Sequence, residues 1–194
     1  MTREASFAVR AQLRTSALFS SRALAVFLAL ILLQGFHMLE HIVQVVQRYA
    51  LGIPDGNGIL GSLTDTEFLH VVYNTPYLGL LVAVYLLLGL DVEGPRRYGW
   101  LVFGLLTFAL VSEAWHEIEH VFKVEQSLAL GQNGTGGIFG QGPGALAPLF
   151  PLPLLHLAYN AIGYLPALAA FVLVLRRGTA TGRRRRTASA GTSS

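Results

Sequence analysis

The histidines of this chain stand in a pattern that occurs twice, once in each half of the sequence. Each half carries His-x-x-Glu-His and, farther along, His-x-x-Tyr-Asn. The first half places these residues at His37, Glu40, His41, His70, Tyr73 and Asn74. The second half places them at His116, Glu119, His120, His156, Tyr159 and Asn160. Because all six histidines fall at duplicated positions, we expect them to share a chemical role, and imidazole chemistry usually concerns metal ions, haem or protons.

The duplication extends beyond the histidines into the loops that follow them. Residues 36 to 61 match residues 115 to 140 without a gap, and both stretches contain Ala-Leu-Gly and then Gly-Ile-x-Gly. The match resumes at His70 and His156. Before His156, the loop of the second repeat is lengthened by the Gly- and Pro-rich residues 141 to 153. Each repeat therefore predicts a helical hairpin with an outward Gly-rich loop. We expect the two hairpins to be related by a pseudo-twofold axis along the membrane normal.

The elements that must position these motifs are long and apolar. Apolar residues make up 53% of the 194-residue chain and charged residues 13%, which is unlike the composition of an ordinary soluble domain. Four apolar stretches, each about 20 residues or longer, are long enough to cross a bilayer. They cover residues 23–46, 68–90, 100–122 and 149–175. The predicted fold class is all-α, an integral membrane protein whose four transmembrane helices form a bundle of two duplicated hairpins.

The placement of arginine predicts the orientation in the membrane. Arginines precede the first apolar stretch, lie between the second and third, and follow the fourth, whereas Arg48 and Lys123 are the basic residues near the opposite helix ends. By the positive-inside rule both termini and the middle loop are cytoplasmic, as in a multi-pass protein of a bacterial inner or plasma membrane. The positive charge is thus topogenic, so we expect membrane lipid and no nucleic acid as a partner. A second copy of the chain is a further candidate partner.

These features divide the chain into segments. Residues 1–22 form a cytoplasmic N-terminal segment, residues 23–90 the first hairpin, and residues 91–99 a short cytoplasmic loop. Residues 100–176 form the second hairpin. Residues 177–194 form a basic tail whose arginine run is typical of disorder.

Helical spacing brings the chemical groups of each motif to one side of its helix. Residues at positions i, i+3 and i+4 share a face, so His37, Glu40 and His41 project together, as do their counterparts in the second half. All of the imidazoles are then expected to meet in one layer near the outer leaflet. A carboxylate within a membrane span is costly unless it is paired, and a metal ion would pair it. The chain has no cysteine, so nitrogen and oxygen ligands must hold such an ion.

We therefore predict a centre of two divalent metal ions, with three histidines and one glutamate for each ion. The predicted ligands are His37, Glu40, His41, His70, His116, Glu119, His120 and His156. The residues expected to surround and orient them are Gln34, Tyr73, Asn74, Glu113, Tyr159 and Asn160. Zinc, iron, copper and nickel all suit a shell of nitrogen and oxygen, so the spacing does not choose between them.

The motif spacing resembles that of two classes of metalloenzyme. His-x-x-Glu-His is similar to the inverzincin pattern, in which two histidines bind zinc and the glutamate acts as a general base. Paired histidines in a membrane bundle also resemble the histidine boxes of membrane desaturases and hydroxylases, which are dinuclear iron enzymes. These resemblances imply an oxidoreductase or hydrolase that acts on a lipophilic or membrane-proximal substrate, with Glu40 and Glu119 as catalytic ligand or base.

Other functions are also compatible with the sequence. The same residues suit a non-catalytic membrane protein that binds or transports metal. They also suit a b-type haem electron-transfer protein, because four-helix membrane cytochromes hold haem between histidines of different helices. His37 or His41 would then face His116 or His120. A network of histidines and carboxylates without a cofactor, structural or proton-conducting, is the last alternative.

Overall fold

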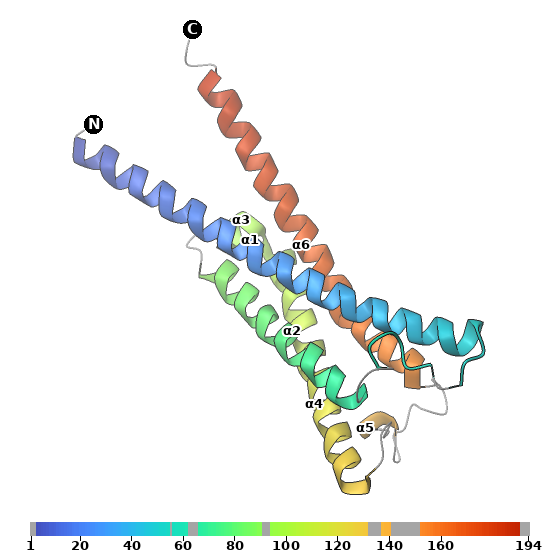
Figure 1. The fold of residues 1–194 in the computed structure, drawn as a ribbon. Coiled ribbons are helices and arrows are strands. Elements are labelled where there is room, and N and C mark those ends of the chain that lie inside the picture. The colour runs from blue at the N-terminus through green and yellow to red at the C-terminus, as the bar shows by residue number, and fades with distance from the viewer. Residues whose placement is uncertain are drawn as a thin grey trace.

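The structure of the protein is a computed structural model that describes residues 3–54, 56–61, 66–90, 94–131, 137–140 and 152–190. Side chains are described within residues 21–177 of these ranges, apart from residues 66, 67, 94, 95, 139, 140 and 152. The long helices are α1 (Arg3–Val45), α2 (Thr66–Gly89), α4 (Trp100–Leu130) and α6 (Leu152–Ala190) (Figure 1). The short elements are a π-helical turn that continues α1, η1 (Val46–Ala50), and the helices α3 (Gly94–Tyr98) and α5 (Gly137–Gly140).

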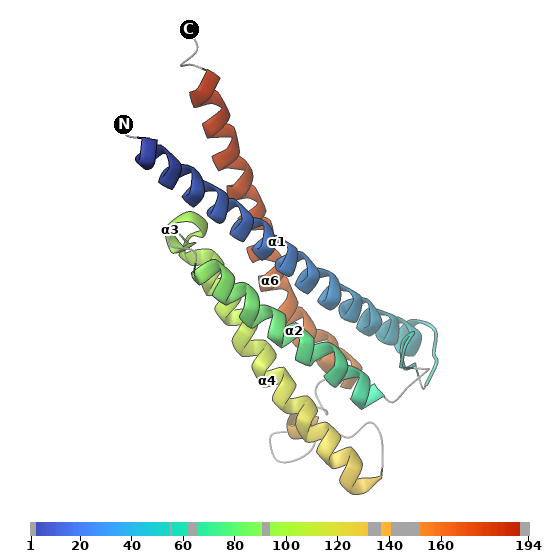
Figure 2. The same ribbon diagram turned by 60° about the vertical axis from the view of Figure 1, so that its left-hand side comes forward.

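The long helices form a bundle in which successive helices run in opposite directions. α1 contacts α2 and α6, and α4 contacts the same two helices, so each long helix has two such neighbours. The first residues of α1 and the last residues of α6 extend from one end of the bundle, here called the terminal end (Figures 1 and 2). The turn after α1 and helix α5 lie at the opposite end, here called the loop end.

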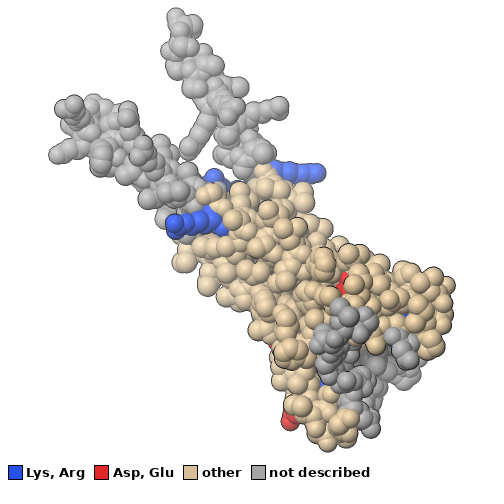
Figure 3. All heavy atoms as spheres, in the orientation of Figure 1, with Lys and Arg blue, Asp and Glu red and all other residues tan. Residues whose placement is uncertain are grey.

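The outer surface of the bundle is apolar along most of its length. Four spans are each long and apolar enough to cross a membrane: Ser21–Ala50, Phe68–Gly89, Trp100–Leu130 and Pro153–Arg177. Large apolar side chains such as Leu32 and Val111 point away from the bundle, with 63% and 64% of their surface exposed. The described middle of the visible face carries few charged side chains, and Lys and Arg gather where the bundle meets the terminal extensions (Figure 3). The all-helical class with four apolar spans is confirmed, and it fits a multi-pass membrane protein.

The interior of the bundle changes from apolar to polar along its length. Toward the terminal end, Phe27 of α1 and Phe171 of α6 meet edge to face with ring centroids 5.1 Å apart, in a core that includes Leu81 and Leu106. Toward the loop end the interior is polar. The buried polar residues are Gln34, His37, Glu40, His41, Gln44, His70, Asn74, Glu113, His116, Glu119, His120, Lys123 and Asn160. A bundle surrounded by hydrocarbon is expected to have this arrangement, with polar residues inside and apolar residues outside.

Helix α6 is longer than its apolar span. It continues to Ala190, through the arginine run for which the sequence predicts disorder. Alanine and arginine have high helix propensity, which favours the continuation of an existing helix. At the terminal end Arg177 donates a hydrogen bond to the backbone oxygen of Tyr98, which ties α6 to α3. Most of the predicted Gly- and Pro-rich loop, residues 141–151, lies outside the described residues.

Candidate metal centre

Each half of the chain presents a pair of histidines on its first span. His37 and His41 lie one turn apart on α1, with ring centroids 4.6 Å apart and Nε2 atoms 3.2 Å apart. His116 and His120 repeat this arrangement on α4, with centroids 4.5 Å and Nε2 atoms 3.3 Å apart. All of these rings are buried. The i, i+4 spacing therefore places each pair edge to face inside the bundle.

The histidines of α2 and α6 join the two pairs into one cluster. His70 of α2 stacks on His120 of α4 with centroids 4.8 Å apart, and it lies 5.0 Å from His41 of α1. His156 of α6 stacks on both His70 and His120 at 5.4 Å. Each long helix thus contributes imidazole to the cluster. The convergence that helical spacing predicts is confirmed.

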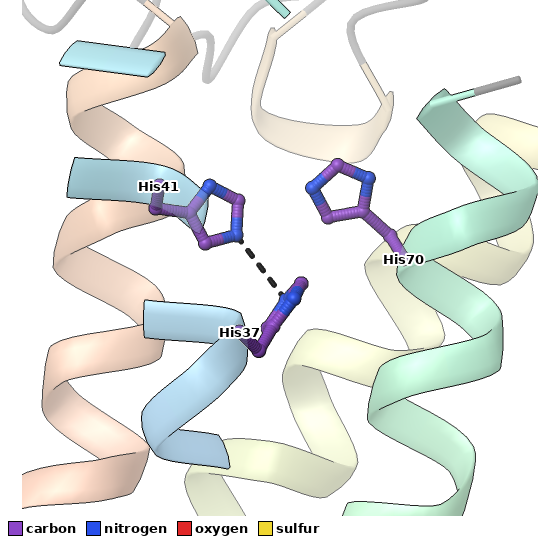
Figure 4. A group of neighbouring side chains, drawn as sticks. All are labelled: His37, His41 and His70. Atoms are coloured by element: carbon purple, nitrogen blue, oxygen red, sulfur yellow. Dashed lines mark hydrogen bonds between the residues drawn. The ribbon is translucent and has the colours of Figure 1, made fainter. Parts of the chain in front are cut away.

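Three of these rings offer ligand atoms close enough to share one metal ion. One nitrogen each of His37, His41 and His70 lies within 4.8 Å of the others, and all three side chains are buried. Figure 4 shows the rings converging from α1 and α2, with the contact between His37 and His41 marked. Two nitrogen ligands held at about 2.05 Å by a tetrahedral zinc ion are about 3.3 Å apart. The 3.2 Å between the Nε2 atoms of the α1 pair is close to that value.

Gln44 orients one ligand of this group. It lies one turn beyond His41 on α1, and its Oε1 is 2.9 Å from His41 Nδ1. Its amide nitrogen donates a hydrogen bond to the backbone oxygen of Asn57 in the loop at 3.2 Å. A ring that donates its Nδ1 proton keeps the Nε2 lone pair for a metal, so the contact favours the tautomer that a ligand needs. Gln44 is absent from the predicted site, although its position three residues after His41 is a signal for it.

The second half of the cluster differs at its third histidine. His156 Nε2 lies 3.0 Å from Nζ of Lys123. Asn160 Nδ2 lies 3.3 Å from His116 Nε2, so another ligand nitrogen also has a polar neighbour. Lys123, which the arrangement of basic residues predicts only to lie near a helix end, is 2% exposed and belongs to the interior of the bundle. The signal for its burial is its match to Gln44 in the gap-free alignment of the two halves.

Glu40, a predicted ligand, faces the loop that follows α1. Its Oε1 accepts hydrogen bonds from the backbone N–H groups of Leu60 at 2.8 Å and Gly61 at 3.2 Å. Gly58 has a φ of 83°, and a Cβ on it would lie 2.6 Å from Glu40 Cδ, so glycine is needed against the carboxylate. Gln47 secures the same turn, because its Oε1 accepts a hydrogen bond from Gly58 N at 2.8 Å. Glu40 thus binds the loop, while the group of three converging ligands consists of histidines.

Glu119 occupies the corresponding place in the second half. Gly137 has a φ of 67°, and a Cβ on it would lie 2.9 Å from Glu119 Cδ. The Gly137 N–H donates to Gln126 Oε1 at 3.0 Å, and Gln126 Nε2 donates to the Gly137 oxygen at 3.3 Å. Gln47 and Gly58 make the same two hydrogen bonds in the first half. Each predicted catalytic glutamate therefore packs against a glycine of the loop that follows its helix.

The two predicted tyrosines lie beside the histidine pairs. Tyr73 of α2 stacks on His37 with centroids 4.7 Å apart. Tyr159 of α6 stacks on His116 at 5.2 Å. Both tyrosines are partly exposed, so each covers one side of a buried histidine pair.

The predicted amides and Glu113 lie one turn farther from the loop end. Gln34 Nε2 donates to Asn160 Oδ1 at 2.6 Å, which joins α1 to α6. The repeat matches Gln34 with Glu113 of α4 and Asn160 with Asn74 of α2, and both of these residues are fully buried. The side-chain polar atoms of this second pair have no hydrogen-bond partner among the described residues. Gly163 leaves room for the carboxylate, since a Cβ there would lie 3.2 Å from Glu113 Oε2.

No protein-family model, curated protein or solved structure matches this chain. The function of the site must therefore be inferred from the chemistry of its residues. Buried imidazole nitrogens that converge within 4.8 Å form a group that could bind a metal ion.

Replacing Gly58 by alanine should destabilise the protein more than the same change at Gly52. Both glycines have positive φ, 83° and 66°, so alanine costs about 1 kcal/mol of backbone strain at either position. At Gly58 the new methyl group also meets Glu40, whereas nothing lies within 4 Å of it at Gly52. Overpacking of this kind adds about 1–3 kcal/mol. Thermal unfolding in detergent measures the difference, and equal melting temperatures would contradict the contact between Gly58 and Glu40.

Replacing Glu113 by glutamine should stabilise the protein. A buried carboxyl group without a partner is more costly than an amide, and the matching Gln34 shows that an amide is accommodated at this position. We expect the free energy of unfolding to rise by about 1–3 kcal/mol. The matched control, Gln34→Glu, breaks the hydrogen bond to Asn160 and should lower stability instead. A lower melting temperature for Glu113→Gln would show that the carboxyl group has a partner of its own.

Proposed function

We propose that this chain is an integral membrane protein that binds a divalent transition metal ion through His37, His41 and His70. The observation that carries the proposal is the convergence of their buried ligand atoms within 4.8 Å. Histidine is the commonest metal ligand among side chains. Three histidines leave one position of a tetrahedral ion for water or a substrate. Zinc, iron, copper and nickel all suit this donor set.

A metal ion accounts for the polar interior better than a histidine network without a cofactor. The Nε2 atoms of His37 and His41 face each other, and in a neutral pair only one of them can donate a hydrogen bond. A cation that accepts both lone pairs satisfies both atoms at the observed spacing. Its positive charge would also offset the buried carboxylate of Glu40, which an apolar interior otherwise makes costly.

The apolar core favours a protein that holds a metal over one that conducts it through the bundle. Phe27 and Leu30 are fully buried, and Leu81 and Leu106 are 1% exposed, between the cluster and the terminal end. The parts of the four spans that lie between the cluster and the terminal end, residues 23–33, 77–90, 100–112 and 161–175, contain no histidine or carboxylate that would pass a metal onward. The open coordination position fits a metalloenzyme, a hydrolase or oxidoreductase in which the ion activates water or dioxygen toward a lipophilic or membrane-proximal substrate.

The packing of the rings disfavours haem as the occupant. A porphyrin held between two axial histidines needs a flat apolar slot between their rings. Here His70 stacks directly on His120 at 4.8 Å. His37 and His41 are also in contact, and Glu40 lies on the same face of α1. The stacked rings therefore leave no slot between them for a porphyrin.

The two hairpins, α1 with α2 and α4 with α6, are duplicates related by a pseudo-twofold axis along the membrane normal. Matching contacts support this relation: the Nε2 atoms of the two histidine pairs are 3.2 and 3.3 Å apart, and the two loop glycines donate to glutamine at 2.8 and 3.0 Å. The termini face the cytoplasm of a bacterial inner or plasma membrane. The arginines at the terminal end, Arg22, Arg96 and Arg176, support this orientation.

Alanine at His37 should remove bound metal, whereas alanine at the matching His116 should leave most of it. The full chain is purified in detergent and loaded with Zn²⁺, and zinc per chain is measured by elemental mass spectrometry. We expect His37→Ala to weaken binding by at least the roughly 10–100-fold that follows loss of an outer hydrogen bond at a metal site. Cobalt(II) in place of zinc reports the geometry through its visible absorption. Full zinc content in His37→Ala would contradict the proposed ligand set.

Single cysteines should report the orientation, because the chain has no cysteine of its own. Leu51, at the loop end, is 65% exposed, and Arg96, at the terminal end, is also exposed. We expect a membrane-impermeant maleimide to label Leu51→Cys in spheroplasts and to label Arg96→Cys only after the membrane is opened. The reverse pattern would place the loop end in the cytoplasm.

A further inference from the structure

We propose that Lys123 takes the place of a second metal ion, so that its ammonium group holds the second half of the cluster while the first half binds metal. This inference rests on the proposed metal site at His37, His41 and His70. It replaces the two ions that the duplicated motif predicts with one metal ion and one lysine.

Lys123 and Gln44 occupy the same place in the two halves. Each lies three residues after the second histidine of its motif, on the face of the helix that carries the histidines. The Cγ atom of Gln44 lies 3.1 Å from the position of a Cβ on Gly58, and the Cγ atom of Lys123 lies 2.9 Å from that of a Cβ on Gly137. The two side chains therefore start along the same path between the helix and the loop.

The ends of the two side chains make different contacts. Gln44 accepts a hydrogen bond from Nδ1 of His41, which leaves the Nε2 atom of that ring to a metal. Lys123 reaches across to α6, and its Nζ lies 3.0 Å from Nε2 of His156. An ammonium group has donors and no acceptor, so the imidazole lone pair is the acceptor in this contact. A lone pair that accepts this hydrogen bond is not available to bind an ion.

The charge of Lys123 also opposes an ion in the second half. The side chain is 2% exposed, so water does little to screen it. A divalent ion bound by His116, His120 and His156 would have to displace the hydrogen bond to His156 and would meet a fixed positive charge beside it. Among the described residues, the group of three converging ligands is accordingly found in the first half.

The ammonium group of Lys123 also provides a positive charge beside Glu119, as a bound metal ion would. Glu119 and Lys123 lie one turn apart on α4 and both pack against Gly137. A positive charge in this position offsets the buried carboxylate, as a metal ion is proposed to do for Glu40. Each half thus combines one glutamate, three histidines and one cation, but the cation of the second half is part of the chain.

Metal stoichiometry tests this inference. The full chain and its variants are purified in detergent and titrated with Co²⁺, and bound cobalt per chain is measured by elemental analysis and visible absorption. We expect about one ion in the unchanged chain and about two in Lys123→Gln, whose amide copies Gln44. The control Lys123→Arg keeps the charge and should stay at about one ion. The reciprocal change, Gln44→Lys, should lose the ion of the first half.

The outcomes separate this inference from the proposed metal site. About two ions in the unchanged chain, or about one in a Lys123→Gln variant with native circular dichroism, would overturn the role of Lys123 and leave metal binding intact. If Lys123→Gln does not fold, Gln44→Lys decides, and full cobalt content in that variant overturns the inference. An unchanged chain that binds no cobalt, zinc, iron, copper or nickel overturns the metal site and this inference with it.

Discussion

Polar side chains buried among apolar helices depend on partners within the bundle, because an apolar core offers no hydrogen bonds. This constraint governs the loop end of the molecule. Gln34 pairs with Asn160 across two helices, and the imidazoles contact one another. Glu40 takes two backbone N–H groups from the loop that follows its helix. The metal ion proposed among the imidazoles would meet the same requirement, since it would pair with lone pairs that the rings cannot all satisfy among themselves.

The Gly-rich loops belong to the site for the same reason. A loop that returns over the helix end brings backbone donors to a carboxylate only if its backbone comes very close. Gly58 and Gly137 allow that approach, because any Cβ would meet Glu40 or Glu119, and their φ values of 83° and 67° suit glycine. Gln47 and Gln126 then bind the same glycines through both backbone groups. The loops thereby hold the two glutamates in place against their glycines.

The sequence predicts the large features of this structure because they depend on periodicity and composition. Span length gives the four helices, and the i, i+4 spacing of His37 and His41 gives a buried pair. Which group the end of a long side chain contacts depends on how the helices and loops pack, and the periodicity of the sequence carries no information on this. The arrangement of basic residues therefore places Lys123 only near a helix end, and the structure adds that its amine lies beside His156. The role predicted for Glu40 as a ligand likewise rests on helical spacing and on the cost of an unpaired carboxylate, and only the folded loop shows that its Oε1 accepts hydrogen bonds from Leu60 and Gly61.

The two differences between the matched polar faces of α1 and α4 have opposite charge. Where α1 carries Gln34 and Gln44, α4 carries Glu113 and Lys123, so one negative and one positive group replace two neutral amides. Glu113 and Lys123 lie about 15 Å apart along α4, which is too far for an ion pair, and the histidine pair of α4 lies between them. Lys123 instead lies one turn from the carboxylate of Glu119, which can offset its charge, whereas Glu113 has no hydrogen-bond partner among the described residues. The change to Lys123 is therefore accommodated by a counter-charge one turn away, whereas the change to Glu113 leaves a buried carboxyl group without a partner among the described residues.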